Sequence, residues 1–161
     1  MKEQSKKIHV LAIRLLFYIY IILLSYFLFF SEHYGRVGTM EDYRYNLELF
    51  KEIKRFIEYR QQLGFESVAV NILGNILAFS PFGFLLPMMN GRFRNFFRLF
   101  FTCFLFTLSV ELLQLVLRVG IFDVDDIFLN TLGGIIGFIT YTVFSASGRR
   151  NCGKKGNGRR R

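Results

Sequence analysis

The sequence has no tryptophan and contains only two cysteines, two histidines and two prolines. Cys103 falls inside an apolar segment and Cys152 in a basic tail, so we expect neither a disulfide between them nor a metal site around either one. His9 and His33 stand apart from the other polar residues. The chain also lacks a Ser/His or Cys/His pair, an HExxH motif and a glycine-rich phosphate loop. These absences argue against an enzyme, and we expect no cofactor.

Long hydrophilic stretches are also scarce. Of the 161 residues, 52% are hydrophobic and 18% aromatic, and the apolar residues form long blocks. A soluble domain of this length could not bury so much apolar surface, so the composition predicts an all-α membrane protein. We predict transmembrane helices at about residues 10–30, 67–89, 96–119 and 127–147. Residues 1–148 would then form one membrane domain.

The net charge of +9 is concentrated in a few segments. Basic residues crowd positions 2–7, 92–98 and 149–161, whereas the turn at 119–126 is acidic. Because positive loops stay in the cytoplasm, the pattern predicts a multi-pass protein with both termini cytoplasmic and a disordered basic tail at 149–161. No nucleic-acid recognition module accompanies the charge, so the expected partner is the lipid bilayer and not nucleic acid.

The largest hydrophilic loop, at 31–66, carries charges of both signs. Between positions 41 and 62 its apolar residues recur at spacings of three and four, which is typical of an amphipathic helix. We expect this helix to lie on the membrane surface or to cap the bundle, in the first extracytoplasmic loop. A lid that closes over a ligand is the alternative.

Polar residues gather around the acidic turn between the third and fourth apolar segments. Glu111, Gln114 and Arg118 precede it on one helical face. With the predicted orientation, these residues and two asparagines of the second segment lie at one depth, in the outer half of the membrane. The candidate polar pocket comprises Asn71, Asn75, Glu111, Gln114, Arg118, Asp123, Asp125, Asp126 and Asn130.

The position of Glu111 inside an apolar segment leaves two interpretations open. A carboxylate facing lipid costs several kcal/mol or changes its protonation, so Glu111 should face the interior of the bundle. A buried hydrogen-bond network would fix the register of the helices. A polar pocket open to the outer surface would make the same residues a functional site. In the fourth segment, Gly133 and Gly137 form a G-x-x-x-G pattern, which predicts close packing against another helix.

Three motifs in this order resemble the VanZ-like family. They are N-I-L-G-N-I-L-A-F-S-P-F-G-F-L-L-P at 71–87, E-L-L-Q at 111–114 and F-D-V-D-D-I-F-L-N-T-L-G-G-I-I-G at 122–137. The resemblance covers about residues 10–147. The matching positions are Asn75, Pro81, Gly83, Glu111, Gln114, Asp123, Asp126, Asn130 and Gly133. In the first loop, Asn46, Leu47 and Phe50 match an N-L-x-P-F-like stretch, with Leu49 where the family has proline.

The resemblance implies a small protein of the bacterial cytoplasmic membrane, active at its outer face in glycopeptide (teicoplanin) resistance or cell-envelope maintenance. Teicoplanin-type drugs carry an acyl chain, so the pocket would bind the acylated glycopeptide or a lipid-linked peptidoglycan precursor. The alternative is an intramembrane enzyme acting on a lipid-linked cell-wall precursor, with Glu111 or an aspartate as acid or base and Arg118 as phosphate clamp. A homo-oligomer could also form a transport path, although four spans without an internal repeat argue against a transporter acting alone.

Overall fold

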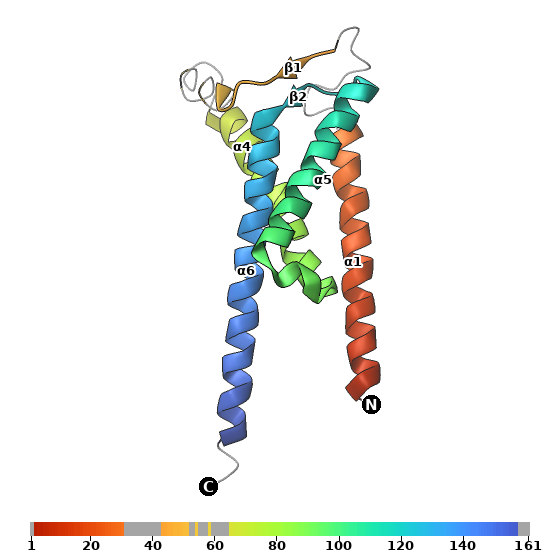
Figure 1. Cartoon of the computed structure of the whole chain (residues 1–161), viewed down its shortest axis with the longest axis vertical. Helices are drawn as coiled ribbons and strands as arrows, with labels where there is room; N and C mark the ends of the chain where they lie inside the picture. The colour runs from red at the N-terminus through yellow and green to blue at the C-terminus, as the bar shows by residue number, and fades with distance from the viewer. Residues whose placement is uncertain (1, 31–42, 52–53, 55–57, 59–64, 158–161) are drawn as a thin grey trace.

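The computed structural model describes residues 2–30, 43–51, 54, 58 and 65–157, apart from the side chains of residues 2, 5, 6, 30, 65–71 and 148–157. Figure 1 shows its long helices, which are α1 (Lys2–Phe30), α4 (Phe65–Met89), α5 (Phe96–Leu117) and α6 (Val124–Asn157). The segments Lys7–Phe29, Ile72–Met89, Phe96–Leu117 and Val124–Ser147 make these 4 helices long and apolar enough to cross a membrane. The predicted all-helical class is confirmed.

Asparagine caps separate α4 from α5. Asn90 accepts a hydrogen bond from the backbone N–H of Arg92 (3.0 Å) and thereby begins η2, a short 3-10 helix over Gly91–Arg94. Asn95 accepts from the N–H of Arg98 (3.1 Å) and begins α5. Each cap satisfies a backbone donor that the first helical turn leaves unpaired. The chain therefore reverses within a few residues, and α5 runs back beside α4.

The two termini lie at the same end of the molecule, and the two short strands lie at the other end (Figure 1). This arrangement fits an even number of membrane crossings with both termini on one side. The last helix, α6, continues to Asn157, into the segment for which the sequence predicts disorder. Only its part up to Ser147 has the length and hydropathy of a membrane span. The division into a membrane domain and a disordered tail stays a prediction.

The first loop is tied to the acidic turn by a short parallel pairing. Strand β1 (Tyr45–Asn46) pairs with β2 (Phe122–Asp123), with Tyr45 opposite Phe122 and Asn46 opposite Asp123. The amphipathic helix expected over 41–62 is therefore wrong for residues 43–50, which form this strand and a turn. Hydrogen bonds to the acidic turn take the place of helical ones here. Much of the remaining expected helix lies outside the described residues.

The tightest contact in the bundle is between α4 and α6. A Cβ added to Gly133 would lie 2.3 Å from the carbonyl oxygen of Ile76, and one added to Gly137 would lie 1.9 Å from that of Ser80. A Cβ on Gly83 would lie 1.8 Å from the carbonyl oxygen of Gly134. The two backbones touch at these glycines, so the close packing predicted from G-x-x-x-G is confirmed, with α4 as the partner.

A small apolar core lies towards the end of the bundle that holds the termini. It contains Phe17 of α1, three residues of α4 and two of α5, and the ring of Phe82 stacks on that of Phe106 with 4.7 Å between centroids. Most side chains of α1 are exposed, whereas those of α6 are buried much more often. We conclude that α4 and α6 form the most closely packed pair of the bundle and that α1 lies along its side.

Candidate functional site

A cavity of about 360 Å³ lies between α1, α4, α5 and α6. Its polar lining comes from predicted site residues of three helices, with exposed fractions of 8% for Asn75, 2% for Glu111 and 1% for both Gln114 and Asn130. Asp126 also lines it. The other lining residues are Tyr20, Leu23, Leu24, Phe27, Leu28, Leu77, Ala78 and Pro81. The cavity thus joins a buried polar end to apolar walls.

Hydrogen bonds between helices hold the polar end of this cavity. Asn75 of α4 donates to the carboxylate of Asp126 on α6 (2.6 Å). Asn130 of α6 donates from its amide nitrogen to the hydroxyl of Thr107 on α5 (3.0 Å). The amide oxygen of Asn130 is buried and has no hydrogen-bond partner. An unpaired buried acceptor costs about 1–3 kcal/mol, so a donor that reached this covered oxygen would gain free energy.

Glu111 and Gln114 connect α5 to segments at the strand end of the molecule. The carboxylate of Glu111 accepts the backbone N–H of Asp123 in β2 (3.1 Å). The side-chain amide of Gln114 donates to the carbonyl oxygen of Leu28 near the end of α1 (2.9 Å). These contacts fix helix positions, as the network interpretation expects, and the same side chains line the cavity. The two interpretations of this cluster are therefore compatible.

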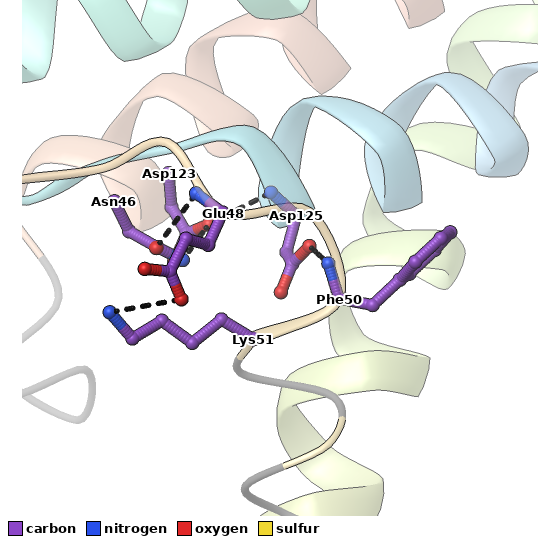
Figure 2. Close-up of polar contacts among 6 residues, drawn as sticks. All are labelled: Asn46, Glu48, Phe50, Lys51, Asp123 and Asp125. Carbon is purple, nitrogen blue, oxygen red and sulfur yellow. Dashed lines mark hydrogen bonds and ion pairs between the residues drawn. The ribbon is translucent and has the colours of Figure 1, made fainter.

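The acidic turn also holds the first loop, through contacts that we call the loop clasp and define by Asn46, Phe50, Asp123 and Asp125 (Figure 2). Asn46 donates from its amide to the carboxylate of Asp123 (3.1 Å). The backbone N–H of Phe50 donates to the carboxylate of Asp125, a side chain that is 1% exposed. Asp123 also accepts the backbone N–H of Asp125 (2.8 Å). One carboxylate thus binds both the loop and the start of α6.

Phe50 adopts a positive backbone angle, φ = 65°, within the loop clasp. This conformation is uncommon for a bulky residue and costs on the order of 1–3 kcal/mol. Its ring packs edge-on against Phe128 of α6 with 5.3 Å between centroids. The hydrogen bond to Asp125 and this aromatic contact offset the strain and hold the loop in one conformation above the helices.

The cavity lining does not include the predicted site residues Arg118, Asp123 and Asp125. Arg118 follows the end of α5 in a left-handed conformation, φ = 56°, and its exposed guanidinium lies 4.5 Å from the centre of the Tyr43 ring. Because the helix ends at Leu117, Arg118 leaves the face that it was expected to share with Glu111. The side chain of Asn71 lies outside the described residues. A role for Arg118 as phosphate clamp in this cavity gains no support from this position.

A second cavity, of about 600 Å³, lies between α5 and α6 under the first loop. Leu47 and Leu49 line it from the loop, Phe100 and Phe104 from α5, and Thr131 from α6. The hydroxyl of Thr131 is buried and has no hydrogen-bond partner. Apart from this hydroxyl the lining is apolar, so the cavity suits a hydrocarbon chain.

In the part of the chain that the structure describes, no group of three or more His, Cys, Asp and Glu residues could hold a metal ion. The described site is instead a cavity that combines carboxylates and amides with an apolar wall, next to a loop held by aspartates. Its carboxylate and amide side chains come from the three sequence motifs, at 71–87, 111–114 and 122–137, and part of its apolar wall comes from α1. In the comparison with known proteins, residues 17–145 match the family described as VanZ/LLP1.

The chain belongs to the VanZ/LLP1 family. Protein VanZ of Enterococcus faecium is 31% identical to it over 70 residues, which are 44% of this chain and 43% of that relative. The chain therefore spans less than half the length of this relative. No solved structure matches. Family membership and the four long apolar helices together identify a multi-pass membrane protein.

Sequence reasoning missed some residues that contact the candidate site and the loop clasp. Thr107 is fully buried and accepts a hydrogen bond from Asn130. It precedes Glu111 by four residues, so helical periodicity could have placed it on the same face of α5. Asn46 and Phe50 carried a signal of another kind, their match to the N-L-x-P-F-like stretch. The match did not predict which residues they contact. Phe50 is bound through its backbone N–H, which every residue except proline has, so the residue type does not reveal the contact.

Proposed function

We propose that this VanZ-like protein acts at the outer face of the bacterial cytoplasmic membrane, where it lowers susceptibility to teicoplanin or maintains the cell envelope through the polar cavity. The observation that carries the proposal is the convergence of the three family motifs on this one cavity, which has a buried polar end and apolar walls. Intramembrane polar groups are costly and generally mark functional sites. The similarity to Protein VanZ and the VanZ-like resemblance of the three motifs supply the link to glycopeptides.

The charge distribution supports placing the cavity near the outer surface. The exposed arginines Arg92, Arg94 and Arg98 lie around η2, at the turn between α4 and α5. The loop clasp and the acidic turn lie at the opposite ends of these helices (Figure 1). Positive loops stay in the cytoplasm, which puts η2 and both termini inside and the loop clasp outside.

The sizes of the cavities limit what they can hold. About 360 Å³ is at the lower end of the range for small-molecule pockets, roughly 300–1,000 Å³. It has room for a lipid head group or a short acyl segment, and not for a glycopeptide core. The apolar second cavity of about 600 Å³ suits an acyl chain. This favours acylated teicoplanin, or a lipid at its site of action, over unacylated vancomycin.

Resistance measured side by side for the two drugs tests this proposal. The gene is deleted and, separately, overexpressed in the native host, and the minimal inhibitory concentrations of teicoplanin and vancomycin are compared. Overexpression is expected to raise the teicoplanin value several-fold and to leave the vancomycin value unchanged, and deletion to lower the teicoplanin value or to cause an envelope defect. A protein carrying Ser109→Thr, a one-methyl change at an exposed position, should behave like the parent. Unchanged teicoplanin values together with an intact envelope would refute the proposal.

A further inference from the structure

Asn130 is the first observation that points to a particular ligand. Its side chain is 1% exposed and lines the polar end of the 360 Å³ cavity, and its amide oxygen has no partner. Its amide nitrogen is already occupied by Thr107. Buried amide groups are normally paired at both ends. This oxygen is itself covered by the protein, so a ligand with an O–H or N–H donor would complete the pairing once the cavity lining shifts to uncover it.

The apolar wall of the same cavity reaches the outside of the bundle between α1 and α4. Leu23 and Phe27 of α1 are 54% and 56% exposed, and Leu77 of α4 is 66% exposed. All three lie within the segments that are long and apolar enough to span a membrane. The cavity therefore opens sideways, towards the hydrocarbon of the bilayer. A ligand that enters by this route must carry hydrocarbon itself.

The described lining also indicates the charge of the head group. It contains the carboxyl groups of Glu111 and Asp126, and it contains no lysine, arginine or histidine. Both carboxylates accept hydrogen bonds, Glu111 from the N–H of Asp123 and Asp126 from the amide of Asn75. A phosphate placed beside them in a medium of low dielectric constant would be repelled. An uncharged head group with hydroxyl donors would not be.

α1 is the element that would admit such a ligand. Of its described side chains only Phe17 and Leu24 are buried, and it is tied to its neighbours by two hydrogen bonds that flank the opening. Tyr20 donates from its hydroxyl to the carbonyl oxygen of Ala78 (2.7 Å), and Gln114 donates to the carbonyl oxygen of Leu28 (2.9 Å). The stretch of α1 between these ties, which includes Leu23 and Phe27, forms the edge of the opening.

We propose that the cavity binds the head of an uncharged, hydroxyl-bearing diacyl lipid of the diacylglycerol type. The lipid enters from the bilayer between α1 and α4, its hydroxyl donates to the amide oxygen of Asn130, and its acyl chains leave past Phe27 and Leu77. This inference deepens the proposed function by naming the ligand of the same site. Binding is measured without any glycopeptide, so its failure is distinguishable from a failure of the resistance phenotype.

The absence of tryptophan makes a direct test available, because one introduced tryptophan reports on one position. Phe27→Trp places it at the opening. Leu113→Trp is the matched control: that residue is 50% exposed, lies next to Gln114 along α5 and lines neither cavity. Each full-length protein is reconstituted in phosphatidylcholine bilayers. Fluorescence quenching is then titrated with brominated dioleoylglycerol and, separately, with brominated phosphatidic acid carrying the same acyl chains.

The proposal expects brominated diacylglycerol to quench the Phe27→Trp protein at a several-fold lower mole fraction than the Leu113→Trp protein. Brominated phosphatidic acid should quench both proteins equally. Adding Asn130→Leu to Phe27→Trp should raise the mole fraction of diacylglycerol needed by about three- to tenfold, as expected for the loss of one hydrogen bond. The same addition to the Leu113→Trp protein should change nothing, which shows that the fold is intact.

Three results would overturn the proposal. Equal quenching of both single-tryptophan proteins by diacylglycerol would show that the opening takes no specific lipid. Preferential quenching of the Phe27→Trp protein by phosphatidic acid would assign a phosphate head group to the cavity. An unchanged diacylglycerol titration after Asn130→Leu would remove Asn130 as the acceptor. The first two results come from proteins in which the polar end of the cavity is unaltered, so they hold even if Asn130→Leu fails to fold.

Discussion

At the scale of single residues, polar groups of this protein both hold segments together and line the candidate cavity. Glu111 accepts a backbone N–H from β2 and lines the cavity, and Asp123 binds Asn46 of the loop and the backbone of Asp125. In an apolar chain each polar side chain is expensive to bury. A compact cluster whose members satisfy one another and also shape a cavity keeps this cost low.

Substitutions of Glu111 separate the two contributions. Glu111→Gln keeps the volume and an acceptor for the N–H of Asp123, so it should accumulate and unfold like the parent but lose activity. Glu111→Ala leaves that N–H without its acceptor and should lower the free energy of unfolding by about 1–3 kcal/mol. The measurements are membrane abundance, thermal unfolding in detergent and teicoplanin susceptibility. A fully active Glu111→Gln protein would show that the charge is dispensable.

Asp125 carries a prediction about the first loop. Asp125→Ala removes the acceptor of the Phe50 N–H and should weaken the loop clasp by about 1–3 kcal/mol. Hydrogen exchange of residues 43–51 should then become faster, while the helices keep their protection. Glu48→Ala is the control, since Glu48 pairs with Lys51 at an exposed site (3.5 Å) and such pairs contribute about 0–1 kcal/mol. If the two variants exchange at the same rate, Asp125 does not hold the loop.

At the scale of elements, the contact between α4 and α6 is the most sensitive to small changes. Gly137→Ala would place a Cβ 1.9 Å from the carbonyl oxygen of Ser80, so the helices must move apart. We expect a loss of about 1–3 kcal/mol in the free energy of unfolding, as for other overpacked positions. Ser109→Thr also adds one methyl group, on the exposed face of α5, and should cost much less. Equal thermal stability of the two proteins in detergent would contradict the close crossing.

Apolar runs predicted the helices well because a membrane span needs a long apolar segment. The expected span at 96–119 corresponds to α5 (Phe96–Leu117), and that at 67–89 to α4 (Phe65–Met89). The pairing of β1 with β2 could not be predicted, since two-residue strands show no alternation. The helix predicted over 41–62 failed at residues 43–50, because helical spacing in a short stretch is weak evidence against specific hydrogen bonds to Asp123 and Asp125.

The site was predictable in composition and not in contacts. Asn75, Glu111, Gln114, Asp126 and Asn130 were expected near one another, and all of them line the 360 Å³ cavity. Their hydrogen-bond partners depend on how each helix is rotated about its axis. The packing of α4 on α6 sets this rotation, and a single sequence does not show it. Arg118 shows the limit of helical periodicity. The prediction that it shares a face with Glu111 assumed that the helix continues through Arg118, but α5 ends at Leu117.

At the scale of the whole molecule, the central claim is that the cavity and the loop clasp face the outside of the cell. Single cysteines in a Cys152→Ser background, labelled on intact cells with a membrane-impermeant maleimide, test it most directly. Tyr45→Cys lies in β1 at a position that is 66% exposed, and Gly91→Cys lies at the exposed start of η2. Cys103 is buried and should stay unlabelled. We predict labelling of the Tyr45→Cys protein on intact cells, and of the Gly91→Cys protein only after the membrane is permeabilised. Labelling of Gly91→Cys on intact cells, with Tyr45→Cys protected, would contradict the account and place the cavity on the cytoplasmic side.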